Sequence, residues 1–291
     1  MSKPVRKAVF PAGGLGTRFL PATKVVPKEM LALVDKPIIQ YGVEEAIASG
    51  IEHIIFVTGR GKGAMEDHFD FSFELDATLE RRGKQELLAV SRGVATMARI
   101  SYVRQKEPLG LGHAVLCAKE LVGDEPFAVI LPDDVIDAQP PCLRQMIDVF
   151  GERQGSVLAT MTIEGPAISA YGVLAGSQDA GNPRIYNCTG MVEKPKFEEA
   201  PSTQAIIGRY VLTPRVFALL EETKPGAGGE IQLTDGIKAL LQEEKVFGYT
   251  FEGKRFDAGD KYGMLQATVE FALKRPEFGD KFRTYLRSLT L

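Results

Sequence analysis

The sequence has no tryptophan, only three cysteines, and no apolar stretch long enough to cross a bilayer. A membrane-spanning helix needs about 20 consecutive apolar residues, so we expect no membrane partner. Residues 1–8 carry positive charge but lack the apolar run of a signal peptide. Cys117, Cys142 and Cys188 are scattered without a C-x-x-C pair, which is typical of reduced thiols that fill core space. We therefore predict a cytoplasmic protein.

The sequence is also poor in histidine and in excess charge. His53, His68 and His113 are far apart and form no recognisable set with a serine or cysteine nucleophile, so we expect structural roles for them. The formal net charge of −3 gives no reason to expect nucleic acid as a partner. A polyanionic ligand would therefore have to be held by a local cluster of cations.

The first half of the chain alternates between apolar segments and helical patterns. Such strands separated by helices predict a doubly wound, Rossmann-like α/β fold, with a mostly parallel sheet and helices on both faces. The predicted strands are 7–10, 53–58, 100–104 and 127–131, and the predicted helices are 37–50, 62–83, which is broken, and 112–121.

After Gly155 the pattern becomes a smaller, mixed β region. We predict short strands within 171–192, with a hairpin signal at 181–183. No linker separates the halves, so we predict one domain over 1–291, with halves 1–155 and 156–291. The other predicted strands are 156–163, 205–212 and 246–256, and the helices are a short one after Pro214, 231–242 and 262–274.

A glycine-rich loop follows the first strand. Gly13, Gly14 and Gly16 let several backbone N–H groups face one ligand, which suits phosphate oxygens. The loop fits neither the P-loop nor the dinucleotide-binding pattern, because Phe19 stands where each needs glycine. A segment constrained by two prolines would bring Arg18 and Lys28 to the same anion.

Two acidic pairs follow predicted strands. Asp133 and Asp134 end the apolar run 127–131, and Asp257 and Asp260 follow the later strand. Ligands of open α/β sheets collect at the carboxyl ends of the strands, and Mg²⁺ shared with phosphates needs only one or two carboxylates. We expect Asp133 to bind metal, and Asp134 and Asp260 to serve as turn or helix-cap residues.

Three motifs carry a resemblance to a known family. Residues 13–18 (GGLGTR), 27–31 (PKEML) and 35–39 (DKPII) resemble the signature of the sugar-1-phosphate nucleotidylyltransferases, and the similarity extends over nearly the whole chain. The resemblance implies that residues 1–155 bind the nucleotide and residues 156–291 bind the sugar.

The resemblance also implies roles for individual residues. Nucleotide binding falls to Ala12, Gly13, Gly14, Gly16, Thr17, Gln105 and Gly110; the sugar falls to Gly172, Glu193 and Lys194; Mg²⁺ falls to Asp133 and Asp257; and Arg18, Lys28 and Lys194 are the catalytic residues.

The expected reaction is uridylyl transfer from UTP to glucose 1-phosphate, with release of pyrophosphate. A thymidylyltransferase and a non-catalytic nucleotide-sugar binding protein remain as alternatives. The resemblance implies a homodimer or homotetramer, and the candidate interfaces are the C-terminal helix and the segment with Phe69, Phe71 and Phe73.

Overall fold

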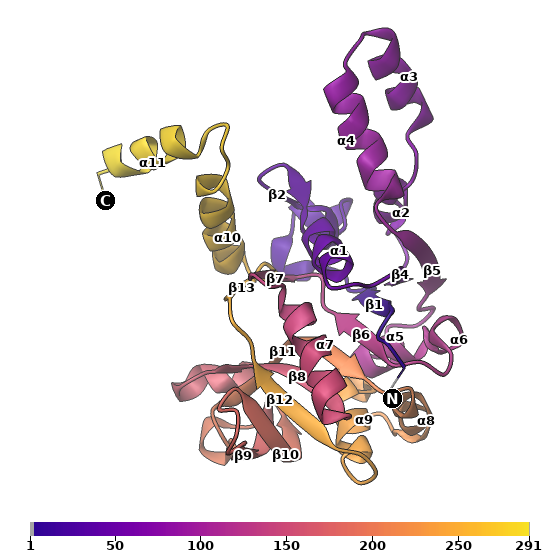
Figure 1. Ribbon diagram of the computed structural model, residues 1–291, viewed down its shortest axis with the longest axis vertical. Helices are drawn as coiled ribbons and strands as arrows, with labels where there is room; N and C mark the ends of the chain where they lie inside the picture. The colour runs from indigo at the N-terminus through magenta and orange to yellow at the C-terminus, as the bar shows by residue number, and fades with distance from the viewer. Residues whose placement is uncertain (1–2, 291) are drawn as a thin grey trace.

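The computed structural model describes residues 3–290 and contains a nine-stranded sheet (Figure 1). Its strands lie in the order β5-β4-β1-β6-β11-β8-β12-β10-β9. They are β1 (Lys7–Ala12), β4 (His53–Thr58), β5 (Arg99–Arg104), β6 (Phe127–Ile130), β8 (Ser156–Thr162), β9 (Gly172–Gln178), β10 (Ile185–Glu193), β11 (Gln204–Leu212) and β12 (Val246–Thr250).

Strands β5, β4, β1 and β6 pair in parallel, with Lys7 opposite both His53 and Phe127. All four residues of β6 are buried, which explains its unbroken apolar sequence. Because the strands are parallel, the loops that follow β1, β4, β5 and β6 meet at one edge of the sheet. The first half of the chain thus has the predicted parallel arrangement.

The expectation of a mostly parallel sheet is wrong for the nine-stranded sheet as a whole, because the mixed β region predicted after Gly155 belongs to the same sheet. Strand β11 runs antiparallel to β6 and to β8, and β10 runs antiparallel to β9 and β12, while only β8 and β12 are parallel. The turn around Asn182 joins β9 directly to β10, as the sequence predicts. A hairpin reverses the chain where a crossover helix would keep it parallel, so this half is mixed.

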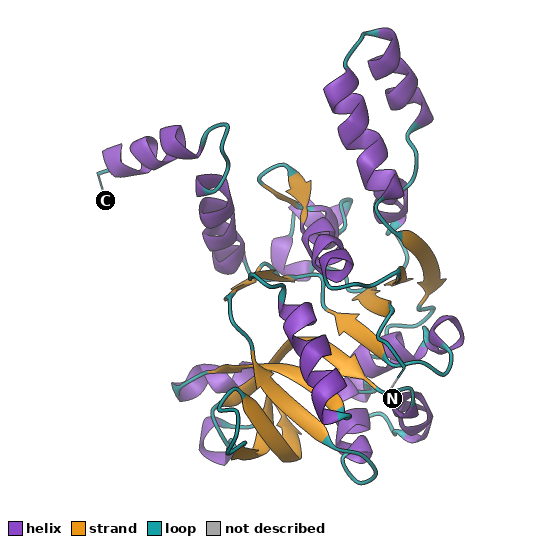
Figure 2. Ribbon diagram, viewed as in Figure 1, coloured by secondary structure: helices purple, strands orange, loops and turns teal. Residues whose placement is uncertain are grey.

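Helices cover both faces of the sheet (Figure 2). One core contains side chains of α1, α2 and α7, with Val94 of α4 packed against it, and the other contains side chains of α5, α6, α8 and α9. The bounds are α1 (Ile38–Ala48), α2 (Gly63–Phe69), α4 (Gln85–Thr96) and α7 (Cys142–Arg153) for the first face, and α5 (Leu111–Leu116), α6 (Lys119–Val122), α8 (Arg215–Glu222) and α9 (Leu233–Leu240) for the second.

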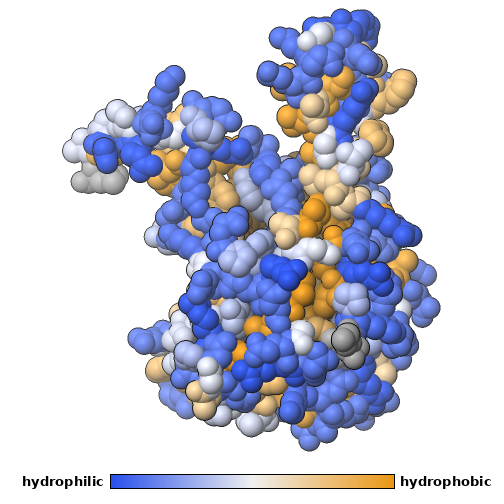
Figure 3. All heavy atoms as spheres, in the orientation of Figure 1, coloured by the Kyte–Doolittle hydropathy of each residue, from blue (hydrophilic) through white to orange (hydrophobic). Residues whose placement is uncertain are grey.

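Helices α3 (Phe73–Arg81) and α4 form an arm that projects from the body (Figure 1). Asp76 accepts hydrogen bonds from Ser91 and Arg92 and so joins the two helices. Phe69 is buried in the core, whereas Phe71 and Phe73 are 62% and 83% exposed. Figure 3 shows apolar residues on this arm above a largely hydrophilic body. Neither α4 nor α7 is among the helices predicted above.

A small second sheet places Asp257 close to the end of β6. Strand β7 (Asp134–Asp137) pairs antiparallel with β13 (Lys254–Asp257), so that Asp134 stands opposite Asp257. The remaining elements are β2 (Ala32–Leu33), β3 (Lys36–Pro37), α10 (Lys261–Leu273), α11 (Gly279–Ser288) and short 3-10 turns at Thr17–Phe19, Ala22–Lys24, Lys28–Met30, Gly165–Ala170, Phe197–Glu199 and Ala227–Gly229.

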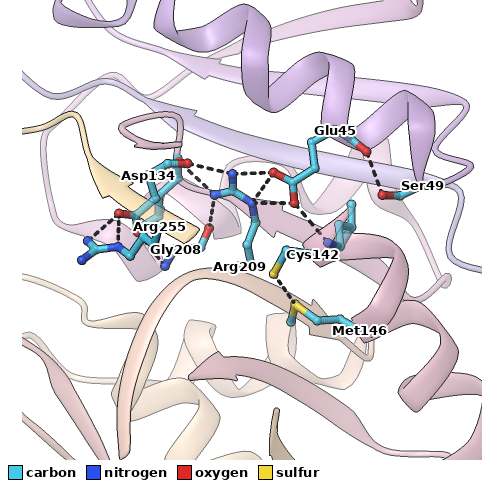
Figure 4. A network of polar contacts seen from close by, with 10 residues as sticks. Glu45, Ser49, Asp134, Cys142, Met146, Gly208, Arg209 and Arg255 are labelled. Atoms are coloured by element: carbon cyan, nitrogen blue, oxygen red, sulfur yellow. Dashed lines mark hydrogen bonds and ion pairs between the residues drawn. The ribbon is translucent and has the colours of Figure 1, made fainter. Parts of the chain in front are cut away.

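A buried ion pair crosses the core beside this junction (Figure 4). Arg209 of β11 is 1% exposed, and its Nη2 lies 2.7 Å from Oε2 of Glu45 on α1. The same guanidinium donates to the backbone carbonyls of Leu131, Gly208 and Asp134. Its donors are thus matched by acceptors from α1, β7, β11 and the turn after β6.

We predict that Arg209→Met lowers the free energy of unfolding by about 3–5 kcal/mol, because Glu45 is left as an unpaired buried charge. Urea unfolding measures the change. Adding Glu45→Met should restore part of the loss. The exposed pair of Arg215 and Glu243 offers a matched control, in which Arg215→Met should change little. Equal effects of the two arginine substitutions would contradict the prediction.

Candidate active site

Three adjoining cavities, of about 310, 410 and 230 Å³, lie at the carboxyl edge of the parallel strands. The first is lined by the glycine loop and by Gln105, the second by Tyr171, Glu193 and Lys194, and the third by Arg18 and Lys28. Asp133 lines all three. The fold therefore brings the predicted phosphate, base and sugar residues around one carboxylate.

The glycine loop leaves β1 directly. Gly13 and Gly14 line the first cavity, and Thr17 lines the third together with Gly16. Gly16 has a φ of 68°, and an added Cβ there would lie 3.0 Å from Cβ of Lys28. Both the backbone conformation and the close approach of Lys28 therefore require glycine. Ala12, by contrast, is buried in the hydrophobic core.

Lys28 and Asp133 form an ion pair, with 2.5 Å between Nζ and Oδ2. Burial lowers the pKa of Lys28, but the carboxylate of Asp133 outweighs burial and raises that pKa above its ordinary value. Burial likewise raises the pKa of Asp133, and Lys28 outweighs it, so the pKa of this carboxyl lies below its usual range. Arg18 lines the same cavity and donates to the carbonyl of Gly259. The two predicted cations do converge.

Asp133 and Asp257 face the same small space beside Gly259. A Cβ added at Gly259 would lie 2.8 Å from Oδ2 of Asp133 and 3.1 Å from Oδ1 of Asp257. The β7–β13 pairing brings these residues together across more than a hundred positions of sequence. Within residues 3–290, no group of three or more histidine, cysteine or acidic side chains forms a metal cluster. A cation here would thus rest on two carboxylates.

Asp134 and Asp260 differ from each other. Asp260 caps α10 as predicted, since its Oδ2 accepts from the backbone N–H groups of Tyr262 and Gly263. The turn or cap role predicted for Asp134 is wrong: its side chain is buried, and it accepts from Arg255 and from the backbone N–H of Gly208 (Figure 4). Asp133 lies in the turn before β7, where it pairs with Lys28, whereas Asp134 begins the strand and pairs with Arg255.

The segment that follows β5 holds Gln105 from two sides. Its Nε2 donates to the carbonyl of Gly110 and lies 3.0 Å from Nδ1 of His113, while its Oε1 faces Gly13. His113, for which the sequence predicts only a structural role, therefore orients Gln105. Gly110 has a φ of 99°, and a Cβ there would lie 2.8 Å from the carbonyl oxygen of Ile231.

The residues predicted to bind the sugar lie on β9 and at the end of β10, beside the start of α9; we call Tyr171, Gly172, Glu193 and Lys194 the sugar segment. Oε2 of Glu193 accepts from the hydroxyl of Thr234 at 2.7 Å and lies beside Gly172. Lys194 has a φ of 46°, a conformation that L residues rarely adopt, and its backbone N–H donates to the carbonyl of Tyr171. Its side chain is 62% exposed, with Nζ 3.5 Å from Glu193. Residues 229–235 contact both groups of predicted site residues, since Ile231 lies beside Gly110 and Thr234 donates to Glu193.

Glu29 is a site residue that the sequence interpretation missed. It is 2% exposed and lines the first cavity; its Oε2 pairs with Nζ of Lys62 at 2.7 Å, whereas its Oε1 has no hydrogen-bond partner among the described residues. Lys62 also donates to the carbonyl of Gly14. A donor for such a buried carboxylate oxygen can come from a water, an ion or a ligand. The acid beside Lys28 in sequence was the available signal.

The fold and the site define a nucleotidyltransferase: the chain matches the family described as nucleotidyl transferase over residues 7–273, and it belongs to that family. The names of the most similar relatives are more specific than the family description. A UTP–glucose-1-phosphate uridylyltransferase of Bacillus subtilis (strain 168) is 51% identical over 287 residues, covering 99% of this chain and 98% of the relative. One from Streptococcus pneumoniae serotype 4 is 49% identical over 293 residues, covering 99% and 97%. The family resemblance seen in the sequence is confirmed.

Solved structures agree. A UDP-glucose pyrophosphorylase complexed with UDP-glucose has a TM-score of 0.85 at 44% identity, covering 93% of this chain and 100% of that one. A UTP-bound UGPase from Acinetobacter baumannii has a TM-score of 0.91 at 40% identity, covering 98% and 100%. A structure described as a glucose-1-phosphate thymidylyltransferase from Bacillus anthracis, at 23% identity and a TM-score of 0.68, shares the fold alone.

We predict that Lys28→Met makes the stability of the protein less dependent on acid. The lowered pKa of Asp133 contributes stability that is present above its ordinary value of 3.8 and is lost as pH falls through the folded-state pKa. Without Lys28, burial is the largest influence on Asp133 and is opposed only by a backbone hydrogen bond and by Arg18, so the pKa of this carboxyl rises. The variant should therefore be less stable than wild type by about 1 kcal/mol at pH 7, and this gap should close below pH 3.

Urea unfolding at the two pH values measures the gap. The exposed Lys24 provides the matched control, since Lys24→Met should leave stability unchanged at both. If the stability difference between wild type and Lys28→Met is the same at pH 7 and below pH 3, then Lys28 does not change the pKa of Asp133.

Proposed function

We propose that the protein transfers the uridylyl group of UTP to α-D-glucose 1-phosphate, giving UDP-glucose and pyrophosphate. The observation that carries the proposal is the position of Asp133, which lines the cavities of the glycine loop, of the cation pair and of the sugar segment. A nucleotide and a sugar phosphate bound in these cavities would bring their phosphates together there. The named relatives and the UTP-bound neighbour support the choice of substrates.

The proposed reaction needs no general base, because a sugar phosphate is already an ionised nucleophile and pyrophosphate is a tolerable leaving group. Catalysis then rests on alignment and charge neutralisation. Arg18 and Lys28 hold the triphosphate against the N–H groups of the glycine loop. Lys194 steers the sugar phosphate, while Glu193 accepts from sugar hydroxyls beside Gly172. The phosphate oxygen attacks the α-phosphorus in line, and its bond forms as the bond to pyrophosphate breaks.

The acidic pair fits a magnesium ion. Oxygens of Asp133 and Asp257 face one space next to the phosphate-binding loop, and in the structure the Lys28 ammonium supplies the positive charge against Asp133. Two carboxylates together with substrate phosphates are an ordinary Mg²⁺ environment. We propose that Asp133 and Asp257 hold the ion, which when bound would neutralise charge on the nucleotide phosphates.

Gln105 and Glu29 would read the base. Both residues line the first cavity, Oε1 of Gln105 lies beside Gly13, and Oε1 of Glu29 has no hydrogen-bond partner among the described residues, so the pair offers acceptors to an N–H donor such as that of the uracil imide. Thymine presents the same donor, which keeps the thymidylyltransferase as a second candidate. A non-catalytic sensor is disfavoured because Arg18, Lys28, Asp133 and Asp257 converge.

We further propose that the chain acts as one domain over 1–291, since β11 of the second half pairs with β6 of the first. The exposed Phe71 and Phe73 on the arm support the proposal of a homo-oligomer. The structure has no helix within residues 3–290 that is long and apolar enough to cross a membrane. The cytoplasmic location remains a prediction, with which the free thiols agree.

We predict that, with glucose 1-phosphate and Mg²⁺, pyrophosphate release is fastest with UTP among UTP, dTTP, ATP, GTP and CTP. A coupled pyrophosphate assay compares the five. Preference for dTTP would favour the thymidylyltransferase, and no release with any of the five would favour the binding protein.

We predict that Lys194→Ala raises the KM for glucose 1-phosphate about tenfold to a hundredfold, because a hydrogen bond to a charged group is lost. The KM for UTP should stay near that of wild type. Lys196→Ala is the matched control, since Lys196 is 78% exposed and two residues away. An equal rise in both KM values would refute the division of labour between Lys194 and the glycine loop.

A further inference from the structure

Arg255 occupies the junction between the acidic pair and the sugar segment. It lies on β13, two residues before Asp257, and its side chain is 10% exposed. It lines the second cavity together with Tyr171, Asp133 and Asp257. Neither the sequence motifs nor the proposed mechanism assigns it a role.

Asp134 anchors the guanidinium. Oδ1 of Asp134 lies 2.6 Å from Nε and 2.5 Å from Nη2 of Arg255, and its Oδ2 accepts from the backbone N–H of Gly208 at 2.8 Å (Figure 4). Asp134 is therefore held by the backbone of β11, and it holds the Arg255 guanidinium in a single position. Little freedom is left to either side chain, because both are buried and both are hydrogen-bonded.

The donors that remain on Arg255 point to two different parts of the site. Nη2 lies 3.5 Å from Oδ2 of Asp257, while Oδ1 of Asp257 accepts from the N–H of Gly259 on the side of Asp133. Nη1 donates to the phenol oxygen of Tyr171 at 3.0 Å, and the guanidinium lies 5.4 Å from the ring centroid. One rigid group thereby contacts a carboxylate of the proposed cation site and a residue of the sugar segment.

Tyr171 in turn controls the backbone that meets the sugar. It precedes Gly172, and its carbonyl accepts from the N–H of Lys194, whose φ of 46° is strained. A shift of the Tyr171 phenol would therefore reach both Gly172 and Lys194. The path from Asp257 to Lys194 consists of contiguous contacts through Arg255 and Tyr171, as energetic coupling between neighbouring sites requires.

We propose that Arg255, acting through the Tyr171 hydroxyl, is a positioning residue that couples divalent-cation binding at Asp257 to binding of the sugar phosphate. This inference rests on the proposed function. A cation on Asp257 fixes the carboxylate against Arg255, which holds Tyr171 and with it the backbone of the sugar segment. Linkage makes the effect reciprocal: Mg²⁺ strengthens binding of a nucleotide sugar by the same factor by which the nucleotide sugar strengthens binding of Mg²⁺.

Calorimetry tests the coupling without turnover. The affinities of UDP-glucose and of UDP are each measured in EDTA and in saturating Mg²⁺, and the Mg²⁺-dependent gain for UDP-glucose is divided by the gain for UDP. This quotient isolates the contribution of the sugar. We expect about fivefold or more for the wild type, and a value near one for Tyr171→Phe, which keeps the ring and removes only the hydroxyl. The UDP-glucose affinity of that variant in EDTA should equal that of wild type.

Controls separate the possible outcomes. Tyr186→Phe removes a hydroxyl that donates to the carbonyl of Gly176, away from the site, and should keep the wild-type quotient. Arg255→Lys should lower the quotient to near one. If that variant does not fold because Asp134 is left without its partner, the result for Tyr171→Phe alone decides between the outcomes. A wild-type quotient in Tyr171→Phe, or an equal loss of UDP-glucose affinity with and without Mg²⁺, would overturn the inference. Failure of the wild type to bind UDP-glucose at all would overturn the proposed function, and the inference with it.

Discussion

The buried guanidinium of Arg209 is the constraint on which the site depends. A charge in the core is tolerated only where every donor is matched, and Arg209 finds its acceptors on α1, on the turn after β6, on β7 and on its own strand. Those acceptors include the backbone on both sides of Asp133. Strand β11 is also where the second half of the chain joins the first. The same group therefore holds the two halves together and fixes the turn that presents the central carboxylate.

The cations of the site divide into two sets. Lys62 and Arg255 are buried and satisfied by internal partners, Glu29 and Asp134. Lys28 and Lys194 are more exposed and line the cavities. A protein with a net charge of −3 cannot attract polyanions by its overall field, so the local cluster must do so. The internal set holds the acids in place, and the outer set pairs with Asp133 and Glu193 at the cavities where we propose that the phosphates bind.

Local patterns predicted most of the elements. The parallel strands of the first half, the hairpin at 181–183 and the cap of α10 follow from apolar runs, turn residues and a well-placed aspartate. Helices α4 and α7 were missed, and no local pattern could show that β11 enters the sheet antiparallel to β6. Strand order is decided by contacts between residues about eighty positions apart, where burial of both faces outweighs local preference.

The sequence by itself determined the chemistry of this protein: a glycine loop with Arg18 and Lys28, acids after two strands, and a polar segment at Gln105. These signals are local, because loop conformation and strand ends depend on neighbouring residues. Only the tertiary structure decided that Asp134 is held by Arg255 and by the backbone of Gly208, and that Oε1 of Glu29 has no hydrogen-bond partner among the described residues. It also set His113 against Gln105 and Arg255 against Tyr171. Each depends on contacts between residues brought together by folding, and side-chain orientation is fixed only when the surrounding core is packed.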